Sequence, residues 1–162
     1  MEIVILVILL IGGIIYKIVN KKSDSNVSVI VNDQQEYLHN ELELDLINKV
    51  NDYRISKGLN KLEIINHISF IASEHNEYMI SIDKVTHDGF DKRSENIKNV
   101  LNAIRVGENI AFGFSSNESA LKSWINNNSH RLNLEGNYTH MGISIREDNS
   151  GRKYYTNIFI YK

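Results

Sequence analysis

Three histidines in the second half of the chain are of a residue type that suits a functional site. His87, His130 and His140 each stand beside Gly, Ser, Thr or Asn, in segments typical of loops or of the edges of elements. Loops held by a rigid scaffold often carry binding and catalytic residues. A neutral imidazole binds a metal ion or transfers a proton near neutral pH, and a nearby carboxylate such as Glu108 would fix its tautomer. The residue types therefore indicate a polar site, although their spacing alone is weak evidence for one.

Several of these side chains have a structural interpretation beside the functional one. His75 falls on the apolar face of a predicted helix, where a hydrogen-bonded core histidine is the expectation. His130 and Arg131 follow the predicted helix that carries Trp124, so they would complement the negative end of its dipole. Glu108 could instead accept backbone amide hydrogens between a helix and a strand. For His130 and Glu108 both roles stay open.

Helices are expected to position these residues. Apolar side chains recur at helical spacing in residues 41–57, with a glycine next in line as a C-cap, and again in residues 68–82. A shorter helix is predicted for residues 91–105. Ser115 and Glu118 are spaced as a capping box, which predicts a fourth helix that ends near the following run of three asparagines. The first two-thirds of the domain is therefore expected to be helical.

The hydrophobic period changes in the last part of the chain. Apolar and small or polar residues alternate in residues 141–146 and again in residues 154–160, and the turn-forming sequence Asp-Asn-Ser-Gly separates the two runs. This pattern predicts a C-terminal β-hairpin. Helices first and paired strands last are typical of an α+β domain, in which helices pack on an antiparallel sheet.

The first twenty residues have a different character from the rest of the chain. Residues 3–19 are apolar or glycine apart from one lysine, which predicts a segment that inserts into a membrane. A cleaved signal peptide usually has a positive charge before its apolar stretch and a small-residue cleavage site after it. Here Glu2 precedes the stretch, and Lys21 and Lys22 follow it. We therefore predict that residues 1–20 form a transmembrane helix, as an anchor or an uncleaved signal.

Composition limits what the remainder can be. Residues 21–40 are rich in Asn, Ser, Asp, Lys and Gln and are predicted to be a solvated linker, which leaves residues 41–162 as one domain. The formal net charge of -2 argues against a nucleic-acid partner. The chain has no cysteine, so a disulfide framework, a thiolate zinc site and a cysteine nucleophile are excluded.

Several ordered motifs resemble those of one protein family, the CAP superfamily, also called the SCP/PR-1-like family. The bacterial branch of secreted CAP domains is the most similar, and the resemblance covers residues 41–162. The motifs that carry it are LINKVNDYRISKGL (46–59), AxxHNxYM (72–79), THDGF (86–90), GENIAFG (107–113), SW followed by SHR and N (123–133), YTHMGIS (138–144) and YYTNIF (154–159).

The resemblance implies a three-layer α-β-α sandwich with a central antiparallel sheet. It also implies a large cleft lined by two histidines and two acidic residues. By motif, the histidines fall on His87 and His140 and the first acidic residue on Glu108. The second acidic position is occupied by Asn127, with His130 close by, as is common in bacterial members. A mechanism that needs two carboxylates is therefore not expected here.

The resemblance also bears on metal binding. In some members of the family the two cleft histidines bind a divalent metal such as zinc, and here these would be His87 and His140. Two neutral ligands alone bind zinc weakly. Modest affinity at most is therefore the expectation.

The expected function is binding, by a membrane-tethered protein whose cleft takes a small polar or lipid-like ligand, with or without a divalent metal. Two alternatives stay open. One is a metal- or base-assisted hydrolase of envelope or extracellular substrates, in which His140 or Glu108 activates water; the other is a structural or partner-binding surface protein. The positive-inside rule, applied to Lys17, Lys21 and Lys22, would place the domain in the cytoplasm. The resemblance instead indicates an extracytoplasmic domain, which we expect.

Overall fold

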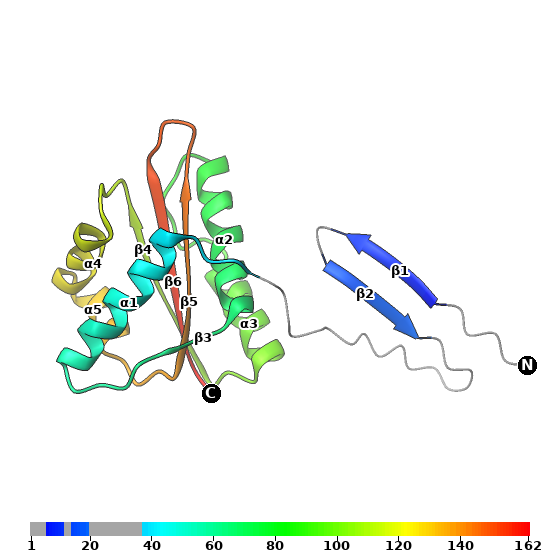
Figure 1. The fold of residues 1–162 in the computed structure, drawn as a ribbon, viewed down its shortest axis with the longest axis horizontal. Helices are drawn as coiled ribbons and strands as arrows, with labels where there is room; N and C mark the ends of the chain where they lie inside the picture. The colour runs from blue at the N-terminus through cyan, green and yellow to red at the C-terminus, as the bar shows by residue number, and fades with distance from the viewer. Residues whose placement is uncertain (1–5, 12–13, 20–36) are drawn as a thin grey trace, which may run out of the picture. The chain divides into compact units, whose positions relative to one another are not determined.

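The chain divides into two compact units, residues 1–35 and residues 36–162. The computed structural model describes the backbone of residues 6–11 and 14–19 in the first unit, and residues 37–162 in the second (Figure 1). The second unit holds all the residues that the sequence predicted as functional.

Two strands occupy the apolar segment for which the sequence predicted a transmembrane helix. They are β1 (Leu6–Ile11) and β2 (Ile14–Val19), and they pair antiparallel. The β-branched residues isoleucine and valine dominate this segment and favour strands, and the Gly12-Gly13 pair between the two runs is a typical hairpin signal. The helix predicted for this segment is therefore corrected to a pair of strands. Among the described residues, no helix is long and apolar enough to cross a membrane.

The second unit includes residues that the sequence assigned to the linker 21–40. The side chain of Tyr37 is largely buried, and its hydroxyl donates to Glu43 Oε1 at 2.7 Å. The same carboxylate oxygen accepts from Arg146 Nη1 and from the backbone NH of Ile145, both at 2.9 Å. Tyr37 thus holds the start of the unit to its sheet, while residues 21–36 of the predicted linker lie outside the described part of the chain.

A four-stranded mixed sheet forms the centre of the second unit. Its strand order is β3 (Glu63–Ile64), β5 (His140–Glu147), β6 (Lys153–Tyr161) and β4 (Arg105–Phe112). The predicted C-terminal hairpin is confirmed as β5 and β6, and β4 pairs antiparallel with β6. The prediction of a purely antiparallel sheet is wrong at β3, which runs parallel to β5. Four helices and β4 separate these two strands in sequence, and so long a connection lets neighbouring strands run in the same direction.

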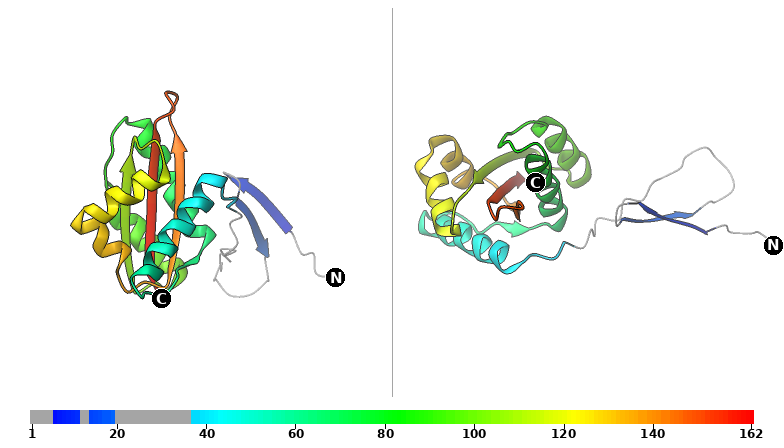
Figure 2. Two further views of the ribbon diagram at one scale, coloured as in Figure 1. Left: turned by 60° about the vertical axis from the view of Figure 1, so that its left-hand side comes forward. Right: turned by 90° about the horizontal axis from the view of Figure 1, so that it is seen from above.

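Helices cover both faces of this sheet, which gives three layers. One face carries α1 (Glu41–Ser56), α4 (Asn117–Asn126) and α5 (Asn128–Leu134), and the other carries α2 (Asn66–Ser81) and α3 (Phe90–Leu101) (Figures 1 and 2). α2 packs on β5 and β6, whereas α3 packs on β4. The predicted α+β architecture, with helices packed on a sheet of paired strands, is confirmed.

The boundaries differ from the prediction in the middle of the chain. The helix predicted for residues 91–105 ends at Leu101, because Asn102 adopts a left-handed conformation with φ 56°. Arg105 then begins β4, a strand that the sequence did not predict. The capping box of α4 forms one residue later than predicted, between Ser116 and Ser119. The separate short helix α5 was not predicted either.

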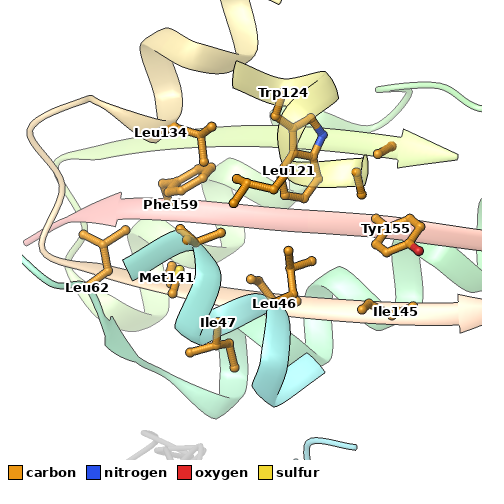
Figure 3. Close-up of a cluster of buried hydrophobic side chains, with 14 of the residues drawn as sticks. Leu46, Ile47, Leu62, Leu121, Trp124, Leu134, Met141, Ile145, Tyr155 and Phe159 are labelled. Carbon is orange, nitrogen blue, oxygen red and sulfur yellow. The ribbon is translucent and has the colours of Figure 1, made fainter. Parts of the chain in front are cut away.

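The larger hydrophobic core lies between the sheet and the helices α1 and α4 (Figure 3). Leu46 of α1, Trp124 of α4 and Phe159 of β6 are fully buried in it. The indole Nε1 of Trp124 donates to the carbonyl oxygen of Ile110 at 2.9 Å, so the one polar atom of this side chain is bonded to β4. The core and this hydrogen bond therefore fix the position of α4 against β4, the strand that carries Glu108.

On the opposite face of the sheet, α2 packs very closely against Gly142 of β5. A Cβ at this position would lie 2.4 Å from the backbone nitrogen of Ser69 and 2.6 Å from Cβ of Ile68. α2 thus lies directly against the strand, at a distance that leaves no room for a side chain.

Candidate functional site

The carboxylate of Glu108 is the centre of the polar site. Its side chain is only 1% exposed, yet Oε1 accepts from His87 Nδ1 and from Arg93 Nη2, each at 2.8 Å, and Oε2 accepts from Arg93 Nε at 2.9 Å. Burial by itself raises the pKa of Glu108, but the hydrogen bonds from His87 and Arg93 outweigh it and lower the pKa below its ordinary value. Glu108 is therefore ionised, and both of its oxygens are occupied.

Glu108 orients the ring of His87. His87 lies in the turn between α2 and α3, and its side chain is 53% exposed. The turn is formed by a bond from the backbone NH of Asp88 to Thr86 Oγ1 and by the left-handed conformation of Gly89, with φ 75°. Because an ionised carboxylate only accepts hydrogen bonds, His87 Nδ1 carries the proton and, in the neutral ring, Nε2 has the free lone pair. The exposed nitrogen is thus the one available for chemistry.

Arg93 is a functional residue that the sequence analysis missed. It lies in the first turn of α3, and besides covering Glu108 its Nη1 donates to the carbonyl oxygen of Asp88 at 2.8 Å. One guanidinium therefore ties the buried carboxylate to the turn that carries His87. A buried carboxylate needs a paired cation, so an arginine close in sequence to the predicted site was a signal that could have been used.

His130 lies close enough to His87 for their charges to interact. Burial lowers the pKa of His130, and electrostatic interaction with the His87 imidazole lowers it further. The position of α5 is set by asparagines. Asn109 Nδ2 donates to the carbonyl oxygen of His130 at 2.9 Å, and Asn133 Nδ2 donates to Asn109 Oδ1 at 2.9 Å and to the carbonyl oxygen of Glu108 at 3.2 Å. The segment with His130 is thereby fastened to the strand with Glu108.

Asn127 has a structural role at the start of α5. Its side-chain Oδ1 accepts from the backbone NH of His130 at 3.1 Å, which makes it the N-cap of the helix. The structure thus places this predicted cleft residue next to His130 but uses its carbonyl oxygen for the cap.

His140 is not brought together with the other predicted site residues. It begins β5 and pairs with Ile160 of β6, whereas Glu108 pairs with Ile158 on the other side of β6. Two strand spacings, about 10 Å, therefore separate the strands that carry His140 and Glu108. The ring of His140 instead has Nδ1 2.8 Å from Thr139 Oγ1 and Nε2 3.5 Å from Glu63 Oε2. The structure thus gives His140 partners other than His87, and metal binding by this pair stays a prediction.

The residues that are brought together do not fit a resident zinc centre. Zinc sites in proteins use at least three protein ligands. Over residues 6–11, 14–19 and 37–162 there is no group of three or more His, Cys, Asp or Glu side chains placed to hold a metal ion. The side chain of Glu108 is buried and accepts three hydrogen bonds from His87 and Arg93, so it is engaged with these two residues. The site is better suited to polar contacts with a ligand.

Comparison with known proteins decides the family. The model of the family described as "CAP: Cysteine-rich secretory protein family" matches residues 47–160. The chain belongs to the CAP family. It does so without any cysteine, so no disulfide stabilises this CAP domain.

This CAP protein is similar to proteins from two Bacillus species. The "uncharacterized membrane protein YlbC" of Bacillus subtilis is 33% identical over 123 residues, which is 72% of this chain and 33% of that protein. The chain thus spans about a third of the length of this relative. An extracellular protein containing an SCP domain from Bacillus anthracis is 26% identical, with a TM-score of 0.64 over 74% of this chain and 40% of that one.

The fold extends to more distant proteins. An outer surface protein from Borrelia burgdorferi has a TM-score of 0.66 at 17% identity, over 77% of this chain and 96% of that one. At this identity the likeness concerns the fold alone. The predicted membership of the CAP superfamily is confirmed.

Proposed function

We propose that this CAP protein acts by binding a small polar or lipid-like ligand at His87, Glu108 and His130. The observation that carries the proposal is the buried Glu108 carboxylate, held by Arg93, which orients the half-exposed ring of His87. A buried ion pair contributes little net stability compared with apolar packing. An arrangement that keeps one here is better explained by the exposed imidazole that it orients.

Hydrogen bonding is the chemistry that this site offers. His87 Nε2 accepts a hydrogen bond when the ring is neutral and donates one when the ring is protonated. His130 supplies a second imidazole nearby, with its pKa lowered by burial and by electrostatic interaction with His87. The ligand that fits is a polar head group, either a small molecule or the head of a lipid-like compound. A divalent metal is not required for this binding.

We also propose that residues 3–19 hold the protein at a membrane, with the CAP domain outside the cytoplasm. The apolar composition of this segment supports membrane association. The name of the Bacillus subtilis relative describes a membrane protein, and that of the Bacillus anthracis structure describes an extracellular one. Accessibility of single cysteines introduced at exposed sites, such as Lys92, to a membrane-impermeant reagent on intact cells tests this. Labelling only after lysis would contradict it.

Base-assisted hydrolysis is a second candidate, favoured by one observation. A carboxylate 2.8 Å from Nδ1 of a histidine whose Nε2 is free is the arrangement of a general base and its orienting group. The base would then be His87 rather than His140 or Glu108. Release of nitrophenol from p-nitrophenyl butyrate by the full chain, lost in His87→Ala and kept in His140→Ala, would support it. An inert wild-type protein would count against it.

Binding is tested by titrating the full chain with octanoate and, separately, with N-acetylglucosamine, a polar ligand without an alkyl tail. The side-chain nitrogen signals of the histidines are followed by NMR. We expect saturable shifts of the His87 and His130 signals with one of the two probes. His87→Ala should abolish binding and His140→Ala should leave it unchanged. Binding that needs His140 but not His87 would overturn the assigned site, and no saturable shift with either probe would count against the ligand classes proposed.

A further inference from the structure

A pocket of about 270 Å³ lies between α2 and the start of α3. α2 contributes Glu74, His75 and Tyr78 to its lining, the turn before α3 contributes Asp88, and the first turn of α3 contributes Arg93. His87, Glu108 and His130 are not among the lining residues. The pocket is therefore distinct from the site of the proposed function, although Arg93 touches both.

His75, which lines this pocket, has one ring nitrogen that is buried without a hydrogen-bond partner among the described residues. Its side chain is buried, and Nε2 lies 2.8 Å from the carbonyl oxygen of Thr86. A carbonyl only accepts, so Nε2 carries the proton, and burial lowers the pKa of His75 and keeps the ring neutral. Nδ1 then has a lone pair, and within residues 37–162 it has no hydrogen-bond partner. The expectation of a fully bonded core histidine holds for only one of the two ring nitrogens.

The other charged groups of the pocket add negative charge. The guanidinium of Arg93 is already bound to Glu108 and to the carbonyl oxygen of Asp88. Among the described residues, the ion-pair partner of Asp88 is the exposed Lys84, whose Nζ lies 3.9 Å from Asp88 Oδ2. Glu74 is exposed on α2 and takes part in no ion pair within the described part of the chain. A ligand entering the pocket thus meets the carboxylates of Glu74 and Asp88, while the guanidinium of Arg93 is already paired with Glu108.

Aromatic rings supply the apolar part of the wall. The ring of Tyr78 stacks on that of His75, with centroids 6.1 Å apart and planes at 21°. Tyr78 is 44% exposed, so one part of its ring remains open to a ligand. The face of a tyrosine ring attracts cations, and Ile71 adds an aliphatic surface beside it.

We propose that this pocket binds a small primary amine with a short apolar body. The ammonium group pairs with Glu74, while the apolar body lies against Tyr78 and Ile71. The volume suits a ligand of roughly ten non-hydrogen atoms, because pockets for drug-sized molecules start at about 300 Å³. The bound amine also contacts Asp88 and so steadies the turn that carries His87.

The test is an NMR titration of the full chain with 2-phenylethylamine and, in parallel, with phenylacetate, which has a similar size and the opposite charge. We expect the amine to bind with a dissociation constant on the order of 1 mM, typical of so small a ligand, and to shift the amide signals of His75, Tyr78 and Gly89. Phenylacetate should not bind. Equal affinity for the two compounds, or no saturable shift with the amine, would overturn the proposal.

Two variants test the roles of the Glu74 charge and of the Tyr78 ring in amine binding. Glu74→Gln should weaken amine binding by about tenfold, because it removes a charge-assisted contact. The matched control is Glu95→Gln, which removes the same charge from an exposed position on α3 and should leave affinity unchanged. Tyr78→Leu keeps an apolar wall without the aromatic face and should also weaken binding. Wild-type affinity in both Glu74→Gln and Tyr78→Leu contradicts the proposal, whereas retained amine binding in His87→Ala separates this pocket from the neighbouring site.

Discussion

The guanidinium of Arg93 covers both oxygens of the Glu108 carboxylate, with Nη2 2.8 Å from Oε1 and Nε 2.9 Å from Oε2. Bidentate pairs of this kind fix orientation as well as charge. The side chains are 14% and 1% exposed, so water screens the pair little. The carboxylate that orients His87 is thus itself held in place from α3.

Removal of Arg93 should destabilise the domain. In Arg93→Ala the buried Glu108 carboxylate keeps only His87 as a partner, and we expect the free energy of unfolding to fall by about 3 kcal/mol. Urea denaturation measures this change. Lys92→Ala removes a positive charge from an exposed neighbouring position and serves as the control. Equal stability of the two variants would show that the pair contributes nothing.

Zinc binding should be weak and should not involve His140. The site offers two imidazoles and no third ligand, so calorimetry should detect low affinity at most. Any heat observed should be lost in His87→Ala and in His130→Ala and kept in His140→Ala. If the heat of binding instead depended on both His140 and His87, these two residues would bind the metal, as the family resemblance implied.

Acid should destabilise the protein in the range where histidines titrate. Burial lowers the pKa values of His39, His75, His130 and His140 below their ordinary value of 6.5. Below pH 6.5 the unfolded chain therefore binds more protons than the folded one, and the free energy of unfolding falls as the pH falls. The urea concentration at the unfolding midpoint should be lower at about pH 5.5 than at about pH 7.5. His75→Gln should flatten this dependence, since His75 is the most buried of the four; an unchanged slope would refute the assignment.

The close contact at Gly142 makes a further prediction. Gly142→Ala places a methyl group 2.4 Å from the backbone nitrogen of Ser69, and backbone does not move aside easily. We expect a loss of about 2 kcal/mol or more in the free energy of unfolding. Ile143→Val, which deletes one methyl group from the neighbouring position, should cost only about 1 kcal/mol. The reverse ranking of the two variants would show that α2 does not lie as close to β5 as described.

Substitutions of Asn127 distinguish its role as the N-cap of α5 from a contact with the ligand. Asn127→Ala should lower stability by about 1 kcal/mol through loss of the cap on α5, and Asn127→Ser should recover most of this because serine also caps helices. Thermal denaturation measures both. If Asn127→Ser lost ligand binding while keeping stability, the side chain would contact the ligand in addition to capping the helix.

Local periodicity predicted the elements whose apolar residues keep a regular spacing. α1, α2 and the hairpin of β5 and β6 belong to this group, because one face of each is buried in a core. β4 was missed for the opposite reason. Glu108 and Asn109 are polar residues buried in the middle of this strand, where their partners come from α3 and α5. Because consecutive residues of β4 are buried and polar and apolar ones are mixed among them, the strand has no alternating pattern to detect.

The sequence by itself determined the family and the α+β class, and it predicted a polar site that includes His87 and Glu108. Only the tertiary structure decided which residues share that site. His140 is in a family motif, but β6 lies between its strand and that of Glu108, and strand order is not encoded in local spacing. Arg93 and His130 join the site because α3 and α5 both pack against β4. The partners of a buried carboxylate are the polar and charged groups that lie next to it. These groups come together only once the helices have packed.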